Sequence, residues 1–262
     1  MARLILATHN AHKADELHAI LEPLIPDLAR EDIVTSADFG YPEPVEDGLT
    51  FEQNALIKAR AAANASGLAA VADDSGLCVD VLGGAPGIFS ARWSGTHGDD
   101  RANLELLLAQ LADIAPAHRG AQFHCAAALV VPRRTEPQDI MEPEGSNAPQ
   151  EPRKLEATAP QEPKKLEANA AGSVTEPGSQ NGPQNPLETQ PSGALEVVEH
   201  GIMRGHLIER PRGEGGFGYD PIFVPQGLEQ TSAQISAARK NELSHRGKAF
   251  RALAEAIRKQ LA

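Results

Sequence analysis

The chain has little cysteine, no long apolar run and no excess of positive charge. Its only cysteines, Cys78 and Cys125, are too few for a disulfide framework and too far apart for the paired ligands of a zinc site. No apolar stretch approaches the roughly 20 residues that a membrane-spanning helix needs, and the first residues lack the full pattern of a signal peptide. The sequence therefore predicts a cytoplasmic protein that has no membrane partner.

Acidic residues outnumber basic ones by 36 to 24, so the formal net charge is -12. Long-range repulsion by this charge opposes binding to nucleic acid or to an anionic membrane surface. A small anion is not excluded, because a local basic pocket is enough to hold it. The 262 residues suffice for a sizeable core, in one large domain or in two small ones.

Residues 133–193 differ in composition from the rest of the chain. They contain no aromatic residue and half of the 20 prolines, and an eight-residue motif that starts at Gln150 returns with one change at Gln161. Such a segment cannot bury enough apolar surface to offset the entropy that is lost on ordering it. We expect a disordered insertion within a single domain that spans residues 1–262.

A predicted strand over residues 3–7 leads into a helix with apolar residues at helical spacing. The turn between the two runs from Thr8 to Lys13. The free N–H groups at the start of a helix, its positive dipole end and the charge of Lys13 all suit a phosphate. The turn is therefore a candidate phosphate cradle, in which His9 and His12 are expected to be solvated.

A second helix is predicted to start after Thr50, which forms a capping-box pattern with Gln53, and to run to about Ser66. Asn54 and Lys58 are four residues apart and share one face of this helix. Lys58 is either a second phosphate ligand or an ordinary solvated lysine.

Two adjacent carboxylates, Asp73 and Asp74, follow the apolar run of residues 68–72. The run is short enough for a buried strand and Gly76 permits a tight turn, so the carboxylates and Ser75 are predicted at a strand end. Neighbouring carboxylates repel each other unless a cation joins them, and a hard divalent cation that also binds phosphate suits them. An Asp-rich surface turn is the alternative interpretation.

Further elements are predicted on both sides of the insertion. Before it come a short strand over residues 78–81, a helix with Asp100 as its N-cap and a strand over residues 123–131. After it we expect two short strands joined by a turn: residues 195–199, Gly201 and residues 203–208.

The last part of the sequence has the residue types of a binding wall. A glycine-rich stretch carries Phe217 and Tyr219, and either ring is expected to stack on a planar ligand. Ser244 is the predicted N-cap of the final helix, which places His245 and Arg246 in its first turn. Their donors and the helix amides are positioned to converge on a carbonyl or phosphate oxygen.

Six motifs occur in order along the chain and together cover it from end to end, except for the insertion. They are Thr8-x-Asn10-x-x-Lys13, Thr50-Phe51-x-x-Asn54-Ala55 with Lys58, Ala72 to Leu77, Gly84-x-Pro86-Gly87-x-x-Ser90-Ala91-Arg92, Gly216 to Pro221, and Ser244-His245-Arg246-Gly247. In this order they resemble the inosine triphosphate pyrophosphatase family, whose members are also called dITP/XTP or non-canonical purine NTP pyrophosphatases.

The resemblance implies an α/β fold, with an elongated mixed sheet, flanking helices and two lobes around a central nucleotide-binding cleft. It implies a homodimer that hydrolyses ITP, dITP or XTP to the monophosphate and pyrophosphate, which removes deaminated purines from the nucleotide pool. The cofactor that it implies is Mg²⁺, one ion per subunit.

The resemblance also implies roles for single residues. Asp74 is the proton acceptor and a metal ligand, Glu46 is the second metal ligand, and Asp73 and Lys13 are further catalytic residues. The substrate-binding residues that it implies are Thr8, His9, Asn10, Ala11, His12, Lys13, Lys58, Ser75, Phe217, Gly218, Tyr219, Asp220, Lys240, His245 and Arg246. The residues of this set up to Ser75 correspond to a triphosphate cradle. Those from Phe217 onward correspond to the wall that holds the purine and reads its 6-oxo group.

One departure from the family pattern affects the metal site. Asp47 stands where the family commonly has threonine, so either Glu46 or Asp47 completes that site. Two other functions stay open, a nucleotide-binding module without catalysis and a phosphohydrolase that removes only the terminal phosphate.

Overall fold

The computed structural model describes residues 2–133 and 194–261 of the chain. The predicted insertion lies outside these residues except for Arg133. Within the described ranges, no helix has the length and apolar character that a membrane span requires.

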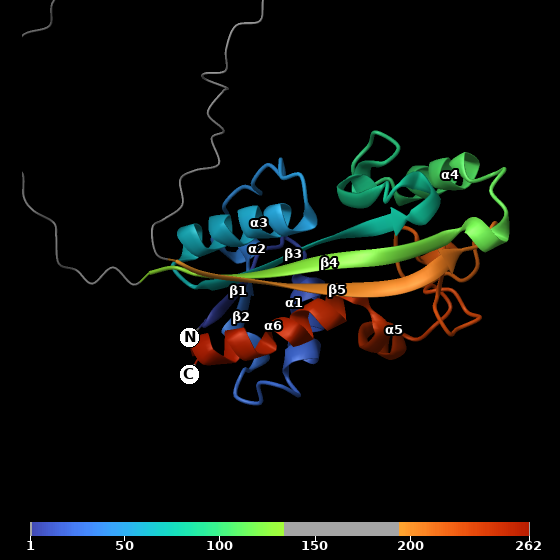
Figure 1. The fold of residues 1–262 in the computed structure, drawn as a ribbon. Coiled ribbons are helices and arrows are strands. Elements are labelled where there is room, and N and C mark those ends of the chain that lie inside the picture. Colours follow the sequence, from blue (N-terminus) through green and yellow to red (C-terminus); the bar gives the residue numbers. More distant parts are fainter. Residues whose placement is uncertain (1, 134–193, 262) are drawn as a thin grey trace, which may run out of the picture. The chain divides into compact units, whose positions relative to one another are not determined.

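A six-stranded mixed sheet forms the centre of the described residues, with the strand order β2-β1-β3-β4-β5-β6 (Figure 1). β1 lies parallel to β2 and β3, whereas the pairs β3–β4, β4–β5 and β5–β6 are antiparallel. The strands are β1 Leu4–Leu6, β2 Ile33–Thr35, β3 Ala69–Val79, β4 Gly120–Val131, β5 Leu195–Leu207 and β6 Phe223–Pro225. β4 and β5 are adjacent, so the insertion follows one strand of an antiparallel pair and precedes the other.

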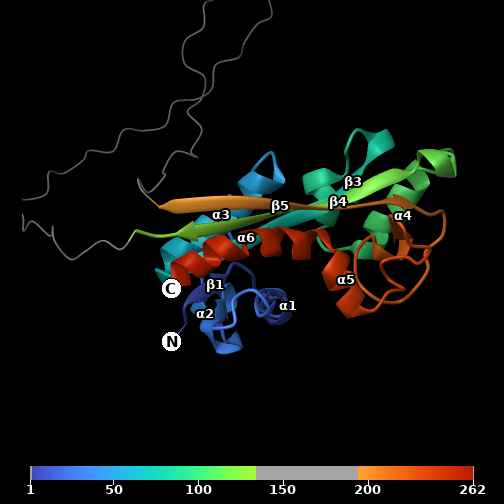
Figure 2. The same ribbon diagram turned by 60° about the horizontal axis from the view of Figure 1, so that its bottom comes forward.

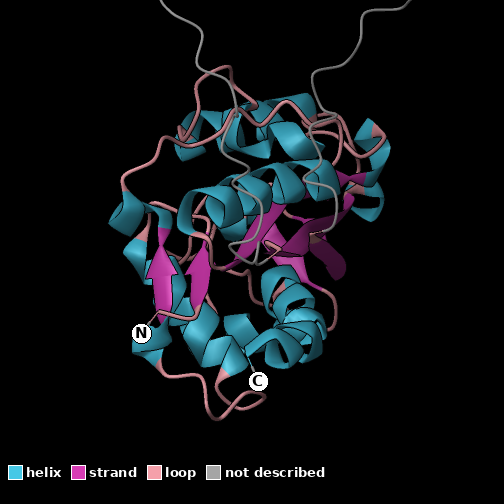
Figure 3. Ribbon diagram, turned by 90° about the vertical axis from the view of Figure 1, so that its left-hand side faces the viewer, coloured by secondary structure: helices cyan, strands magenta, loops and turns pink. Residues whose placement is uncertain are grey.

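Helices lie on both faces of this sheet. α3 covers one face, and α1 and α6 cover the other, as the two turned views show (Figures 2 and 3). The α-helices are α1 Ala11–Leu21, α2 Ser36–Phe39, α3 Phe51–Ser66, α4 Asp100–Gln110, α5 Ala237–Leu243 and α6 His245–Leu261. The short 3₁₀ segments are η1 Arg30–Asp32, η2 Asp80–Leu82, η3 Gly87–Arg92, η4 Pro116–His118 and η5 Asp220–Ile222. This arrangement confirms the predicted α/β class, a mixed sheet with flanking helices.

Different side chains fill the two faces of the sheet. Leucines and other large residues of α1 and α6, such as Leu17 and Phe250, pack on one face. On the other face α3 presents alanines, among them Ala59 and Ala62, to the alanines of β3 and β4. Small side chains let the helix axis approach the sheet closely. α3 is therefore held near the strands, so its polar side chains can reach strand residues.

The ends of α3 and α6 follow the predicted caps. The Thr50 hydroxyl accepts a hydrogen bond from the Gln53 N–H at 3.1 Å, and α3 ends at Ser66. The Ser244 hydroxyl accepts one from the Gly247 N–H at 2.9 Å at the start of α6. Local capping chemistry thus sets both helix starts, as the sequence predicts.

The predicted turn at Gly76 is wrong. β3 runs without a break from Ala69 to Val79, because it pairs with β4 from Ala70 to Val79. The predicted strand at 78–81 is its end followed by η2. Gly76 serves close packing instead, since a Cβ there would clash with the Gly87 carbonyl oxygen and would lie 3.1 Å from the Phe51 ring. The carboxylates therefore lie in the middle of a strand.

The predicted turn at Gly201 is wrong for the same reason. β5 is one strand from Leu195 to Leu207, and α6 packs directly over its glycine. A Cβ at Gly201 would clash with the His245 carbonyl oxygen and lie 2.7 Å from the Ala249 nitrogen.

A smaller correction concerns the start of α4. Its N-cap is Asp99 rather than the predicted Asp100, because the Asp99 carboxylate accepts the Ala102 N–H at 3.0 Å.

Gly201→Ala is expected to destabilise the protein by about 1 to 3 kcal/mol, the usual cost of overpacking a filled site. The added methyl group meets backbone atoms of α6, which cannot rotate away. Urea denaturation would measure the loss in the free energy of unfolding. His200→Ala, the neighbouring exposed position on β5, is the control and should change stability by less than about 0.5 kcal/mol. Equal effects of the two changes would contradict the close approach of α6 to β5.

Candidate active site

The candidate site lies along an open edge of β3. β1 pairs with β3 only as far as Leu6 and Val71, and within the described ranges no strand continues along that edge until the bridge between Cys78 and Pro86. The predicted site residues Asp73, Asp74 and Ser75 occupy the uncovered stretch. The carboxyl end of β1 leads to the same place. The expectation that the carboxylates lie at the end of their own strand is wrong, because β3 continues to Val79.

Adjacent strand residues point to opposite faces of a sheet. Asp74 therefore faces α3, where two side chains bind it. The Asn54 amide nitrogen donates to Asp74 Oδ2 at 3.1 Å, and the Lys58 ammonium lies 3.3 Å from Oδ1. Sequence reasoning placed Asn54 and Lys58 on one helix face but gave Asn54 no role. The signal that was available is a polar residue on the alanine-rich, buried side of α3.

Glu46 completes this cluster through Lys58. The Lys58 ammonium lies 3.1 Å from Glu46 Oε1 while it contacts Asp74, so one cation reaches both carboxylates. Asp47, the alternative metal ligand, has an exposed side chain. Burial raises the pKa of Asp74, and the negative charge of Glu46 raises it further. Lys58 and Asn54 lower this pKa, but the net shift is upward.

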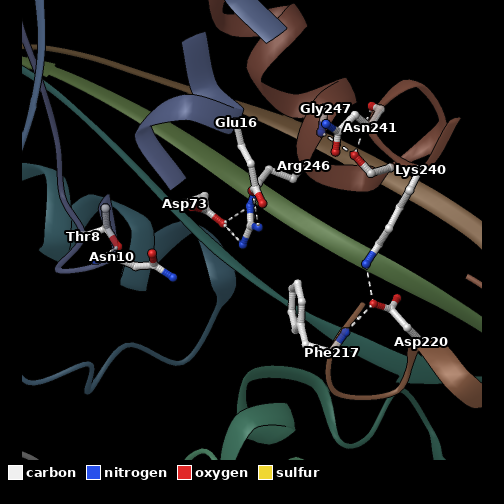
Figure 4. A network of polar contacts seen from close by, with 11 residues as sticks. Thr8, Asn10, Glu16, Asp73, Phe217, Asp220, Lys240, Asn241, Arg246 and Gly247 are labelled. Carbon is white, nitrogen blue, oxygen red and sulfur yellow. Dashed lines mark hydrogen bonds and ion pairs between the residues drawn. The ribbon is translucent and has the colours of Figure 1, made fainter. Parts of the chain in front are cut away.

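Asp73 faces the opposite side of the sheet and pairs with Arg246 from α6. The Nε and Nη2 atoms of Arg246 each lie 2.9 Å from Asp73 Oδ2, and its Nη1 lies 3.7 Å from Glu16 (Figure 4). Burial alone would raise the pKa of Asp73, but Arg246, Lys13 and Lys58 together hold it well below its ordinary value. Asp73 is therefore ionised across the physiological range.

A cavity of about 450 Å³ opens beside this pair. It brings together eight of the predicted substrate-binding residues: Ser75, Phe217, Gly218, Tyr219, Asp220, Lys240, His245 and Arg246. Its volume is within the range typical of small-molecule sites.

Only one of the two candidate stacking rings is free to stack on a ligand. Phe217 is 63% exposed, and the Lys240 ammonium lies 4.8 Å from its ring centroid while it also binds Asp220 (Figure 4). Tyr219 borders the cavity but is 4% exposed, and its hydroxyl donates to the Ser90 carbonyl at 3.0 Å. Tyr219 therefore anchors the glycine-rich loop to η3.

His245 forms part of the cavity wall as a neutral ring. It stacks on Phe123 with centroids 5.0 Å apart and an interplanar angle of 11°. Burial, assisted by the charge of Arg246, lowers the pKa of His245 to about 3. Its Nδ1 atom is buried and has no hydrogen-bond partner among the described residues. A buried polar atom of this kind is available to form a hydrogen bond with a ligand in the cavity.

The predicted phosphate turn borders the carboxylates from the side of β1. The Asn10 N–H donates to the Thr8 hydroxyl at 3.2 Å, and α1 begins at the next residue. His9 is exposed, and it borders a small pocket that also touches Glu46 and Lys58. Ala11 and His12 belong to the helix backbone, but their side chains lie outside the described part of the structure.

The carboxylates beside Lys58 offer oxygen ligands to a metal ion, but not a complete set of protein ligands. In the described ranges no three His, Cys, Asp or Glu side chains converge as a metal site. Glu46 and Asp74 are nonetheless close enough to share one cation, since both contact Lys58. Two carboxylates with room for phosphate oxygens and water suit the chemistry of Mg²⁺.

Comparisons with known proteins agree on one family. The model of the Ham1 family matches residues 4–147 and 187–256. The chain is 47% identical to a dITP/XTP pyrophosphatase of Streptomyces avermitilis, over the whole of both chains, and 43% identical to one of Bifidobacterium longum subsp. infantis, over 97% of this chain and 98% of the other.

Solved structures give the same result. A HAM1 protein from Coxiella burnetii superposes with a TM-score of 0.69 at 29% identity, covering 99% of this chain and 100% of the other. A nucleoside-triphosphatase, also titled dITP/XTP pyrophosphatase, from Mycobacterium abscessus gives a TM-score of 0.59 at 38% identity, covering 97% and 98%.

The neutral state of His245 predicts a specific pH dependence of stability. Its pKa in the folded protein, about 3, is below the value of about 6.5 in an unfolded chain. Below pH 6.5 the unfolded chain therefore binds a proton that the folded chain does not, and stability falls by as much as about 1.4 kcal/mol per pH unit. His245→Phe should flatten the loss of stability between pH 6.5 and pH 4, measured by urea denaturation. His97→Phe, at an exposed loop position, should leave the wild-type slope, and an unchanged slope in His245→Phe would contradict the neutral ring.

Proposed function

We propose that this chain, which belongs to the Ham1 family, hydrolyses non-canonical purine nucleoside triphosphates, namely ITP, dITP and XTP, to the monophosphate and pyrophosphate. The observation that carries the proposal is the position of the 450 Å³ cavity. Ser75 and Arg246 lie on its wall, and Arg246 binds Asp73, the neighbour of Asp74. A purine in the cavity would thus direct its phosphates to the edge of β3.

The cavity wall suits a purine with an oxygen at position 6. Phe217 offers an exposed ring for stacking, and the N–H groups of Arg246 that do not bind Asp73 offer donors. The neutral His245 contributes a ring nitrogen that has no other partner among the described residues. A 6-amino group would leave donors unpaired, which costs about 1 to 3 kcal/mol for each buried group.

The triphosphate would lie along the open edge of β3. The Val71 carbonyl accepts the Ala7 N–H at 2.8 Å, and the Leu77 N–H donates to the Ser90 hydroxyl at 2.9 Å. Because backbone groups alternate in direction along a strand, the N–H groups of Asp73 and Ser75 point to the same edge. Together with the turn from Thr8 to Lys13 and with Lys58, they supply donors and positive charge for phosphate oxygens.

The two carboxylates divide the chemistry. Asp73 stays ionised because of the positive charge of Arg246, and it positions the side of the site that Arg246 occupies. Asp74, with its raised pKa, accepts a proton from the water that attacks the α-phosphorus, and pyrophosphate leaves in line. Mg²⁺ held by Asp74 and Glu46 would neutralise charge on the phosphates when bound.

The same proposal includes the organisation of the whole protein. We assign residues 1–262 to one catalytic domain interrupted at 133–193, acting as a cytoplasmic homodimer with one Mg²⁺ per subunit. The insertion is adjacent in sequence to β4 and β5, on which α6 packs.

An assay of both possible products tests the function. Purified chain with Mg²⁺ is expected to release pyrophosphate, and no orthophosphate, from ITP, dITP and XTP, and EDTA should abolish the release. ATP should be hydrolysed with a kcat/KM lower by about 10- to 100-fold, since its 6-amino group leaves donors unpaired. Asp74→Asn is the inactive control and should still bind nucleotide.

Each alternative function predicts another result of this assay. Orthophosphate as the product would move the attack to the terminal phosphate and contradict the proposal. Saturable nucleotide binding without any product would favour a regulatory module.

Glu46 and Asp47 provide a matched pair for the metal site. Glu46→Gln is expected to raise the Mg²⁺ concentration for half-maximal activity by at least about tenfold, because a charged ligand is lost. Asp47→Asn removes the same charge from the neighbouring, exposed position and should leave that concentration near the wild-type value. The reverse order of effects would assign the metal to Asp47.

A further inference from the structure

We infer that Asn54 is a positioning residue that fixes the orientation of Asp74 relative to the loop that carries Glu46. The inference rests on the proposed function, because it gives these two carboxylates their roles. Asn54 is fully buried in the first turns of α3 and does not border the cavity. It therefore acts through other residues rather than on the nucleotide.

The hydrogen bonds of Asn54 allow only one orientation of its amide. Its Oδ1 atom accepts the Gly48 N–H at 2.9 Å, and a backbone N–H can only donate. The oxygen must therefore face Gly48, which leaves the NH₂ group to face Asp74. It donates to Asp74 Oδ2 at 3.1 Å. The orientation of the carboxylate is thus set by a backbone group of the neighbouring loop.

This single side chain links the two sides of the proposed metal site. Gly48 follows Glu46 by two residues, so the bond to its N–H holds the loop that carries Glu46. The bond to Asp74 leaves Oδ1 of that carboxylate for Lys58, which also contacts Glu46. The loop is packed against the amide, since a Cβ at Gly48 would lie 2.6 Å from Asn54 Oδ1. A loss of the amide therefore removes one contact from Asp74 and one from the loop of Glu46 at once, and leaves Lys58 as the remaining link.

The chain contains a matched control for this role. Asn103 occupies the same position in α4 that Asn54 occupies in α3, the fourth residue after the N-cap, and it is 1% exposed. Its Oδ1 accepts the Ser94 N–H at 2.7 Å, and its Nδ2 donates at 3.1 Å to the Ala91 carbonyl. The two residues differ in the second partner, which is a carboxylate for Asn54 and a backbone carbonyl for Asn103.

The test compares Asn54→Asp with Asn103→Asp in the full-length chain, with wild type measured alongside. Each change keeps the acceptor for the loop N–H and replaces the donor. We expect Asn54→Asp to lower kcat for dITP by about 10- to 100-fold, the usual effect of losing a partner that orients a metal ligand. Its KM and its dITP binding in EDTA should stay close to wild type. Asn103→Asp should keep the wild-type kcat.

A second measurement does not depend on catalysis. Hydrogen exchange at the Gly48 amide, followed by NMR, should be slow in wild type, Asn54→Asp and Asn103→Leu, but fast in Asn54→Leu, which lacks the acceptor. Equal kcat values for the two Asp variants, or slow Gly48 exchange in Asn54→Leu, would overturn the inference. A wild-type chain that releases no pyrophosphate would overturn the proposed function itself, and the exchange rates would still report whether Asn54 holds the loop.

Discussion

Two neighbouring carboxylates in the middle of a sheet constrain the rest of this structure. Asp73 and Asp74 point to opposite faces of β3, so each carboxylate pairs directly with a different cation. Arg246 of α6 binds one carboxylate, and Lys58 of α3 binds the other. Partly buried charges are stable only when they are paired and hydrogen-bonded. The helices on the two faces of the sheet thus supply the charges that the strand requires.

The geometry of the sheet makes these charges accessible to a ligand. β3 pairs with β4 from Ala70 to Val79, whereas its other edge loses its partner after Val71. A ligand at that edge can meet side chains from both faces of the strand as well as its backbone amides. If another strand paired along this edge, a ligand on one face could not reach the carboxylate on the other, because the sheet would lie between them. The early end of β1 is therefore as important for the site as the residues themselves.

Local signals in the sequence were sufficient for some of this arrangement. The caps at Thr50 and Ser244 act within one helical turn, so both helix starts were predicted correctly. Gly76 and Gly201 were misread as turns, because a glycine that allows a turn looks the same in sequence as one that allows close packing. What distinguishes them is a contact with η3 or with α6, far away in the chain. The pairing of Arg246 with Asp73 is equally non-local, since 173 residues separate the two.

The same two carboxylates show how an environment separates the chemistry of identical groups. Arg246, Lys13 and Lys58 outweigh the effect of burial at Asp73 and keep its pKa low, whereas burial and Glu46 prevail at Asp74 and raise its pKa. Neighbouring acids whose pKa values are pushed apart can take different roles, one as a fixed charge and the other as a proton acceptor. Opposite faces of one strand make this possible, because each carboxylate meets a different helix. The division of roles in the proposed mechanism therefore follows from the two-residue period of a strand.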